Sequence, residues 1–130
     1  MEQPVNETQR LLDTLSEMMQ QEEAKQMMVE QMGCSMRLIV GRSECLVVDA
    51  RHMSGAATRR NDEDTKVDAT LEISEDAFDL VCAGRLTPAH AFMTGRLKVT
   101  GDMKRAMKSS VLFKLLREAR PSEHRLNSRL

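Results

Sequence analysis

The stretch Phe92–Met103 constrains the fold most, because twelve residues combine a helix stop, a strand and a helix start. Gly95 suits the end of a preceding helix, since a residue without Cβ adopts the left-handed conformation at little cost. Leu97 and Val99 alternate with polar residues, which is typical of a strand with one apolar face and one solvent-exposed face. Asp102 can accept backbone N–H groups at the start of the next helix. The stretch therefore predicts a helix, a half-buried strand and a second helix in direct succession.

The rest of the chain supplies further elements of the same two kinds. A polar cap at Asn6 and apolar residues at helical spacing predict a long first helix that ends at Gly33 and can break in its polar stretch, 20–26. Alternating or valine-rich runs predict strands at Cys34–Val40, Cys45–Arg51, Ala56–Arg60, Lys66–Ile73 and Arg96–Thr100. We expect three more helices, the last of which bends at Ser109-Ser110, and their caps are Ser74, Thr87 and Asp102.

This order of elements predicts an α+β domain with a five-stranded sheet and its helices on one side. Along the chain it runs helix, three strands, crossover, strand, two short helices, strand, helix. A chain of 130 residues is long enough for one domain with a sizeable core. We place this domain at residues 1–120, because Pro121 cannot continue the last helix, and we expect a flexible tail at 121–130.

Charge and composition exclude several classes of function. The net charge is −1, with 19 basic and 20 acidic residues, so we expect no basic face for nucleic acid. With three Phe and neither Trp nor Tyr, base stacking on aromatic side chains is not expected either. No apolar run reaches the roughly 18 residues of a membrane span, and the polar N-terminus does not resemble a secretory signal.

The sequence offers no arrangement typical of catalysis, of a metal site or of a cofactor site. The histidines are scattered, and no Cys or carboxylate lies at a metal-ligand spacing from His52, His90 or His124. The odd number of cysteines, without a short Cys pair, indicates buried thiols in a reducing compartment at Cys34, Cys45 and Cys82. Cys82 would act as a nucleophile only if a base approached it, so a buried inert thiol is the preferred interpretation.

Apolar bulk is the remaining candidate for function. Eleven methionines, whose side chains are flexible and fill irregular space, contribute much of it. The predicted helices carry apolar residues at Phe78–Val81, Phe92–Met93, Met103–Met107 and Val111–Leu116. Laid over a one-layer sheet, these helices could leave a tunnel in which a lipid binds by losing apolar area to water. The pattern alone does not separate a tunnel from a filled core, and the dense packing of protein interiors favours the filled core.

Three segments carry a family resemblance: Leu46–Asp49, Val67–Ile73 and Phe92–Met103, which Ala106-Met107-Lys108 continues. From about residue 34 to residue 108 the chain resembles the sterol carrier protein type two domain. The resemblance implies a five-stranded sheet covered on one face by helices. It also implies a non-catalytic apolar tunnel for fatty acids, fatty acyl-CoA, phospholipids or sterols, with a movable C-terminal helix as its cover.

On this resemblance we expect one set of side chains to line the tunnel. Met103 and Met107 would lie on the movable helix, Phe92 and Phe113 would stand at the mouth, and Met107→Arg would abolish binding while the sheet stays folded. The full set comprises Phe78, Val81, Phe92, Met93, Leu97, Val99, Met103, Met107, Leu112, Phe113 and Leu116. Anionic head groups or CoA phosphates could meet a basic stretch, which can equally be a solvated face, at Lys104, Arg105 and Lys108.

The sequence given ends in Ser128-Arg129-Leu130, which resembles the peroxisomal Ser-Lys-Leu address with Arg in the basic position. A receptor reads this address only at a free end. Together with the family resemblance, it predicts a stand-alone member in the peroxisomal matrix, with the cytoplasm as a second location. The expected partners are a lipid or acyl-CoA ligand, a peroxisomal import receptor and, transiently, a membrane surface.

Two other classes of function stay open. An interaction or scaffold module would have the same fold with an occluded cavity, and its partner surface would be Val111–Leu116. An enzyme acting on acyl-CoA comes third and would require Cys82. Lipid retained by the purified protein in native mass spectrometry would favour the carrier, and acyl-CoA activity that is lost in Cys82→Ser would favour the enzyme.

Overall fold

The structure, a computed structural model, describes residues 7–42, 44–59 and 65–118. Three expectations lie outside these ranges: the cap at Asn6, the tail at 121–130 and the address Ser128-Arg129-Leu130. The described residues form an α+β fold with a five-stranded mixed sheet, which confirms the predicted fold class.

The sheet has the strand order β3-β2-β1-β4-β5. Its strands are β1 (Ser35–Val40), β2 (Glu44–Asp49), β3 (Ala57–Thr58), β4 (Ala69–Ile73) and β5 (Leu97–Gly101). β1 and β4 run parallel, and the other neighbouring pairs are antiparallel. In this order β3 and β5 are the two edge strands of the described sheet.

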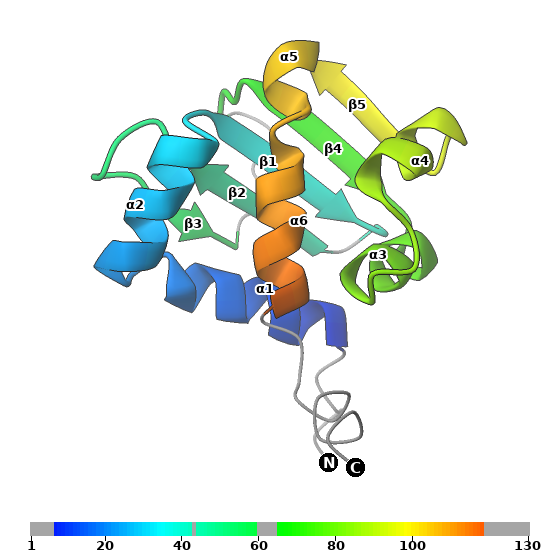
Figure 1. Ribbon diagram of the computed structural model, residues 1–130, viewed down its shortest axis with the longest axis horizontal. Helices are drawn as coiled ribbons and strands as arrows, with labels where there is room; N and C mark the ends of the chain where they lie inside the picture. The colour runs from blue at the N-terminus through cyan, green and yellow to red at the C-terminus, as the bar shows by residue number, and fades with distance from the viewer. Residues whose placement is uncertain (1–6, 43, 60–64, 119–130) are drawn as a thin grey trace.

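The helices gather on one face of the sheet, as Figure 1 shows. They are α1 (Glu7–Met18), α2 (Glu22–Gln31), α3 (Glu75–Cys82), α4 (Pro88–Met93), α5 (Met103–Ala106) and α6 (Ser109–Glu118). α6 crosses in front of the strands and contacts α1, α2, α3 and α4, so it is the central helix of this layer.

The core lies between the helices and the covered face of the sheet. Leu38 in β1 is in register with Leu46 in β2 and with Leu71 in β4, so the three side chains share one face. All three are fully buried. A shift of one residue would turn these side chains to the opposite face, so the alternating pattern specifies the register.

Two helix breaks follow from local hydrogen bonds. Between α1 and α2 the N–H of Gln20 bonds to the carbonyl of Glu17 in a tight turn, which confirms a break at the polar stretch of the first helix. The bend expected at Ser109-Ser110 is instead a complete break just before them. There the N–H of Lys108 bonds to the carbonyl of Arg105, and α6 begins at Ser109.

Several predicted strands are longer than the observed ones, and the strand expected at Cys45–Arg51 ends at Asp49 as β2. The strand expected at Lys66–Ile73 begins at Ala69. Asp68, just before it, bonds to Ser35 twice: its N–H donates to the carbonyl of Ser35 at 3.0 Å, and its Oδ2 accepts from the N–H of Ser35 at 2.9 Å. The strand expected at Ala56–Arg60 pairs with β2 only at Ala57–Thr58 among the described residues.

Arg59 holds α1 at the edge of the sheet. Its guanidinium forms ion pairs with Asp13 in α1 and with Glu44 in β2, and it also donates to the carbonyl oxygens of Gln9 and Cys45. Glu44 is only 4% exposed, so its carboxylate is a buried charge that needs this partner.

Candidate ligand-binding site

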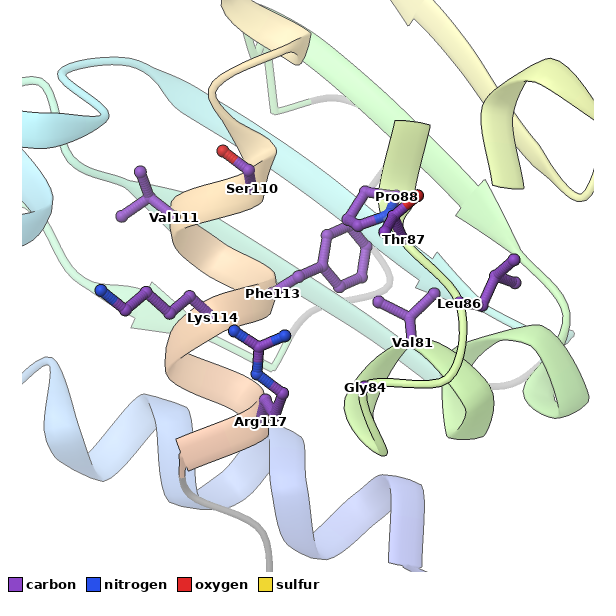
Figure 2. Close-up of a pocket in the computed structure, with 10 residues that line it drawn as sticks. All are labelled: Val81, Gly84, Leu86, Thr87, Pro88, Ser110, Val111, Phe113, Lys114 and Arg117. Atoms are coloured by element: carbon purple, nitrogen blue, oxygen red, sulfur yellow. The ribbon is translucent and has the colours of Figure 1, made fainter. Parts of the chain in front are cut away.

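A groove runs between α6 and the segment that joins α3 to α4 (Figure 2). Its volume is about 310 Å³, at the lower end of the range typical of small-molecule pockets. α6 supplies one wall, and the end of α3 with the residues that follow it supplies the other. The lining residues are Val81, Gly84, Leu86, Thr87, Pro88, Ser110, Val111, Phe113, Lys114 and Arg117.

α6 has two faces with separate roles. Leu112 and Leu116 are fully buried in the core. Ser110, Phe113 and Arg117 follow one another at spacings of three and four residues, which places them on one side of the helix, along the groove. The helix is therefore held to the core by one face and lines the groove with another.

Phe113 joins the two walls of the groove. Its ring lies 6.5 Å from the ring of Phe78 in α3, centroid to centroid, and the two planes are inclined by 58°. Tilted aromatic pairs at this separation are favourable, because the edge of one ring meets the face of the other. Both rings are 3% exposed or less, so the contact is buried and ties α6 to α3 behind the groove lining of Phe113.

The opposite wall is shaped by two helix ends. α3 ends before Gly84, whose φ of +77° is a left-handed conformation that glycine adopts without strain. The N–H of Arg85 then bonds to the carbonyl of Leu80 at 2.9 Å. Thr87 caps α4 by accepting from the N–H of His90 at 3.1 Å. These bonds confirm the helix end and the helix start predicted at Gly84 and Thr87, and they order the connection.

The charged residues that line the groove are both cations, Lys114 and Arg117. Figure 2 shows the Arg117 side chain turned back along α6 toward Phe113, whereas Lys114 extends away from Phe113. An apolar groove with a guanidinium at its rim is suited to an amphiphile with an apolar tail and an anionic head.

The structure brings two of the eleven predicted tunnel residues to this groove, Val81 and Phe113. Four others lie buried in the core: Phe78, Leu97, Leu112 and Leu116. Val99 packs against the core and is partly buried. Four lie at the surface: Phe92 is 43% exposed, Met93 80%, Met103 48% and Met107 75%. A tunnel lined by all eleven residues stays a prediction.

Sequence reasoning missed most of the groove lining, for two reasons. Leu86 and Pro88 lie in or next to a short connection, where hydrophobic periodicity gives no signal. The sequence placed anionic head groups at the basic stretch from Lys104 to Lys108, so the predicted site did not include the cations of α6. Arg117 follows Phe113 by four residues, so the helical spacing alone could have placed it beside the predicted apolar site.

The run Val111–Leu116 does not form the exposed partner surface expected of an interaction module. Leu112, Phe113, Leu115 and Leu116 are all 3% exposed or less, so this expectation is wrong. An amphipathic helix that packs on a core uses its apolar residues there, and few remain for a partner.

The cysteines and histidines of the described residues, the other side chains that could be reactive or bind a metal, do not line the groove. Cys34, Cys45 and Cys82 are buried thiols that form no disulfide among the described residues, which confirms their expected burial. Desolvation by burial raises the pKa of Cys34 and of Cys45, so both thiols stay protonated near neutral pH. The histidines His52 and His90 are exposed, and the described residues hold no group of three side chains able to bind a metal ion.

The basic stretch expected to meet head groups lies on and after α5, away from the groove lining. Arg105 forms ion pairs with Asp68 at 2.8 Å and with Asp102 at 3.7 Å. Lys104 and Lys108 are exposed. The stretch is therefore a surface feature that is separate from the apolar groove.

The SCP-2 sterol transfer family matches residues 12–114, which include the sheet and nearly all of the groove lining. The chain belongs to this family. Lipid or sterol transfer is therefore the general function of its SCP-2 domain, and the ligand class that the family implies is lipid. In the described part of the chain, no helix combines the length and the apolar character needed to cross a membrane.

Relatives of this SCP-2 chain are known in several organisms. Sterol carrier protein 2 of Homo sapiens is 34% identical over 68 residues, which are 52% of this chain but only 12% of the human protein. Non-specific lipid-transfer protein-like 1 of Caenorhabditis elegans is 29% identical over 85 residues, or 62% of this chain and 70% of that protein. The chain thus spans a small part of the human relative and most of the nematode one.

Solved structures share the fold of this SCP-2 chain. The apo form of Sterol Carrier Protein 2 from Yarrowia lipolytica has a TM-score of 0.68 at 20% identity, and the match covers 90% of this chain and 96% of that one. Sterol carrier protein domain 2 of Helicoverpa armigera has a TM-score of 0.60 at 26% identity, with 87% of each chain covered. The similarity to the yeast protein concerns the fold alone.

Proposed function

We propose that this SCP-2 chain is a non-catalytic carrier that binds one lipid in the groove between α6 and the α3–α4 connection. The observation that carries the proposal is the make-up of the groove: an apolar lining with the guanidinium of Arg117 at its rim. Fatty acids, fatty acyl-CoA, phospholipids and sterols are the candidate ligands. The charge of Arg117 favours those with an anionic head.

The size of the groove sets how much binding energy its apolar lining can supply. A tail that loses about 200 Å² of apolar area gains about 5 kcal/mol. A micromolar dissociation constant requires about 8 kcal/mol. Hydrogen bonds to a charged group contribute about 1.5–3 kcal/mol each, so an anionic head at Arg117 supplies the missing part. A neutral lipid of the same tail length is expected to bind more weakly.

A pair of arginine substitutions tests the position of the site. Val111→Arg places a charge in the apolar lining without removing a core residue, since Val111 is only partly buried. It is expected to weaken binding of a fluorescent fatty acid at least tenfold. Met107→Arg introduces the same charge at a residue that is 75% exposed and outside the groove lining, so it is expected to leave binding unchanged.

The reverse result would place the ligand elsewhere. Loss of binding in Met107→Arg, with normal binding in Val111→Arg, would favour the tunnel expected from the family resemblance. No binding by folded, delipidated wild-type protein would contradict the carrier itself.

The role of Arg117 is tested by comparing a fatty acid with the fatty alcohol of the same length. Arg117→Gln is expected to lower affinity for the acid about tenfold and to leave affinity for the alcohol unchanged, because only the acid carries a charge. Arg85→Gln is the matched control, since Arg85 is exposed and does not line the groove. Equal losses for acid and alcohol would show that Arg117 acts by packing.

We further propose that residues 1–120 act as a stand-alone carrier and that the protein works in the peroxisomal matrix. The support is the similarity of Ser128-Arg129-Leu130 to a peroxisomal address, which an import receptor would read where Leu130 is a free end. Microscopy of the chain fused at its N-terminus to a fluorescent protein, with and without this tripeptide, tests the location. Import that persists without the tripeptide would contradict this role of the C-terminus.

A further inference from the structure

Outside the groove, the exposed large apolar side chains of the described residues concentrate around β5. Phe92 and Met93 lie in α4, just before the strand, and are 43% and 80% exposed. Met103 and Met107 follow the strand and are 48% and 75% exposed. The remaining large exposed apolar residue is Met53, in the connection between β2 and β3. Exposed apolar side chains that gather in one region typically mark an interaction site.

The same segment is strongly basic. Residues 88–108 contain five Arg or Lys and one Asp, a net charge of +4, whereas the whole chain has a net charge of −1. Two of these cations have acidic neighbours, since Arg105 pairs with Asp68 and Lys98 lies opposite Glu72 in the sheet. The other three are exposed and form no ion pair with any residue that the structure describes: Arg96, Lys104 and Lys108.

The apolar and basic residues lie along one edge of the molecule. β5 is an edge strand, and Figure 1 shows α4 and α5 at its two ends. Five residues of strand span about 16 Å, which separates the two apolar groups. We call the whole set the β5 edge patch, and it consists of Phe92, Met93, Arg96, Met103, Lys104, Met107 and Lys108.

At the α5 end of the patch, apolar and basic side chains alternate in position. Met103 begins α5 and Met107 is its C-cap, four residues later, so the two are neighbours on one face. Lys104 lies in α5, and Lys108 directly follows the C-cap. Ala106 is 3% exposed and packs inward. This end therefore presents two flexible apolar side chains next to two flexible cations.

We propose that the β5 edge patch docks the protein on the surface of an anionic phospholipid bilayer. A bilayer is an extended partner that can meet apolar side chains at both ends of β5 at once. Its negative surface potential attracts the cations, while methionine and phenylalanine enter the interface. A second copy of this chain fits less well, because the two patches would bring like charges together. The docking does not depend on which ligand the groove holds.

The positive charges and the apolar side chains of the patch are expected to contribute independently to the affinity for the bilayer. Each Lys or Arg near an anionic surface strengthens binding about fivefold at physiological salt, and this part weakens as salt screens the charges. Burial of an exposed methionine strengthens binding about tenfold and depends little on salt. A bilayer without anionic lipid should therefore bind the protein weakly.

The test is cosedimentation of the folded protein with vesicles of phosphatidylcholine, with and without phosphatidylserine. Wild type is expected to sediment with the anionic vesicles at about 0.1 M salt and much less at about 1 M. The double variant with Lys104→Gln and Lys108→Gln should bind these vesicles more weakly, by about fivefold for each lysine removed. Met93→Ser with Met107→Ser should lower binding about tenfold for each methionine, at both salt concentrations.

Matched controls lie elsewhere on the surface. Met53→Ser removes the exposed methionine that is outside the patch, and Arg42→Gln removes an exposed cation between β1 and β2. Both are expected to bind vesicles like wild type. Binding of a fluorescent fatty acid in solution should be the same for all variants, which separates docking from the groove.

Three results would overturn the proposal. The first is equal binding to neutral and anionic vesicles. The second is loss of binding in the control variants to the same degree as in the patch variants. The third is a wild-type dimer in analytical ultracentrifugation that dissociates in Met93→Ser with Met107→Ser while vesicles bind neither form, because the patch would then be a protein interface.

Discussion

Asp68 joins β1, β4 and α5 through one carboxylate. Its Oδ2 accepts from the N–H of Ser35 at 2.9 Å, and its Oδ1 accepts from the guanidinium of Arg105 at 2.8 Å. The backbone hydrogen bond from Ser35 is the largest cause of a lowered pKa of Asp68, and the charge of Arg105 adds to it against the opposing effect of burial. A carboxyl group whose pKa falls on folding stabilises the folded state above its unfolded pKa, and this contribution is lost as pH falls through the folded pKa.

We expect Asp68→Asn to lower the free energy of unfolding at neutral pH. The free energy of unfolding of this variant should also depend less on pH in the acidic range. The difference from wild type should shrink as pH falls from about 3.9, the ordinary pKa of aspartate, toward the lower pKa of folded Asp68, because wild-type Asp68 becomes protonated over this range. Urea unfolding at a series of pH values measures both effects. The pKa of Asp49 is also lowered, chiefly by its hydrogen bond from Arg51, so some acid dependence will remain in the variant. A difference that stays constant at every pH would contradict the assigned role.

At the scale of elements, two glycines define the ends of the α4–β5 segment. Gly95 follows α4 with φ of +78°, and Gly101 ends β5 with φ of +93°. Alanine in a left-handed conformation costs about 1–2 kcal/mol at either position. A Cβ at Gly101 would also lie 2.6 Å from the carbonyl oxygen of Asp68, whereas nothing lies within 4 Å of a Cβ at Gly95.

Gly101→Ala is therefore expected to lower the free energy of unfolding by more than Gly95→Ala does. Gly95→Ala should lower the free energy of unfolding by about 1–2 kcal/mol, the cost of the backbone conformation alone. Gly101→Ala should lower it further, because the new Cβ also pushes β4 away from β5. Urea unfolding of the two variants in parallel measures the difference. Equal losses would mean that the backbone around Gly101 relaxes freely.

The elements could be predicted from the sequence wherever a local signal exists. The alternation around Leu71 identifies a strand, and the caps at Ser74 and Thr87 identify two helix starts, each of which accepts the expected backbone N–H. The beginning of β4 was not predicted: Asp68, just before it, bonds to Ser35, thirty-three residues earlier in the chain. A pattern within one segment contains no information about such a partner.

The groove was less predictable than the elements. Helical spacing shows that Phe113 and Leu112 lie on different sides of α6, but not which neighbour each side meets. Met93 and Met107 were expected in a tunnel because of the family resemblance, yet they are 80% and 75% exposed. Whether an apolar face is covered depends on how the helices are placed over the sheet, and only the three-dimensional arrangement determines that placement.

At the scale of the whole molecule, α6 couples ligand binding to stability. Its buried leucines belong to the core, and its other side lines the groove, so the groove exists only while the core is formed. A ligand that binds only the folded protein raises the free energy of unfolding by about 2.7 kcal/mol at a free concentration of 100 times its dissociation constant. A carrier should therefore unfold at a higher temperature in the presence of its lipid.

We expect a saturating fatty acid to raise the melting temperature of wild type and of Met107→Arg by the same amount, and to raise that of Val111→Arg clearly less. Hydrogen exchange should show increased protection in α6 and in residues 83–88, which form the two walls, because the ligand opposes their separation. The sheet should gain protection as well, because its exchange requires global unfolding, whose free energy the ligand raises. Protection that rises around β5 but not in the two walls would place the lipid at the edge patch. An unchanged melting temperature in wild type, at concentrations that saturate a fluorescent probe, would mean that the probe binds the unfolded chain as well, and the carrier assignment would lose its thermodynamic basis.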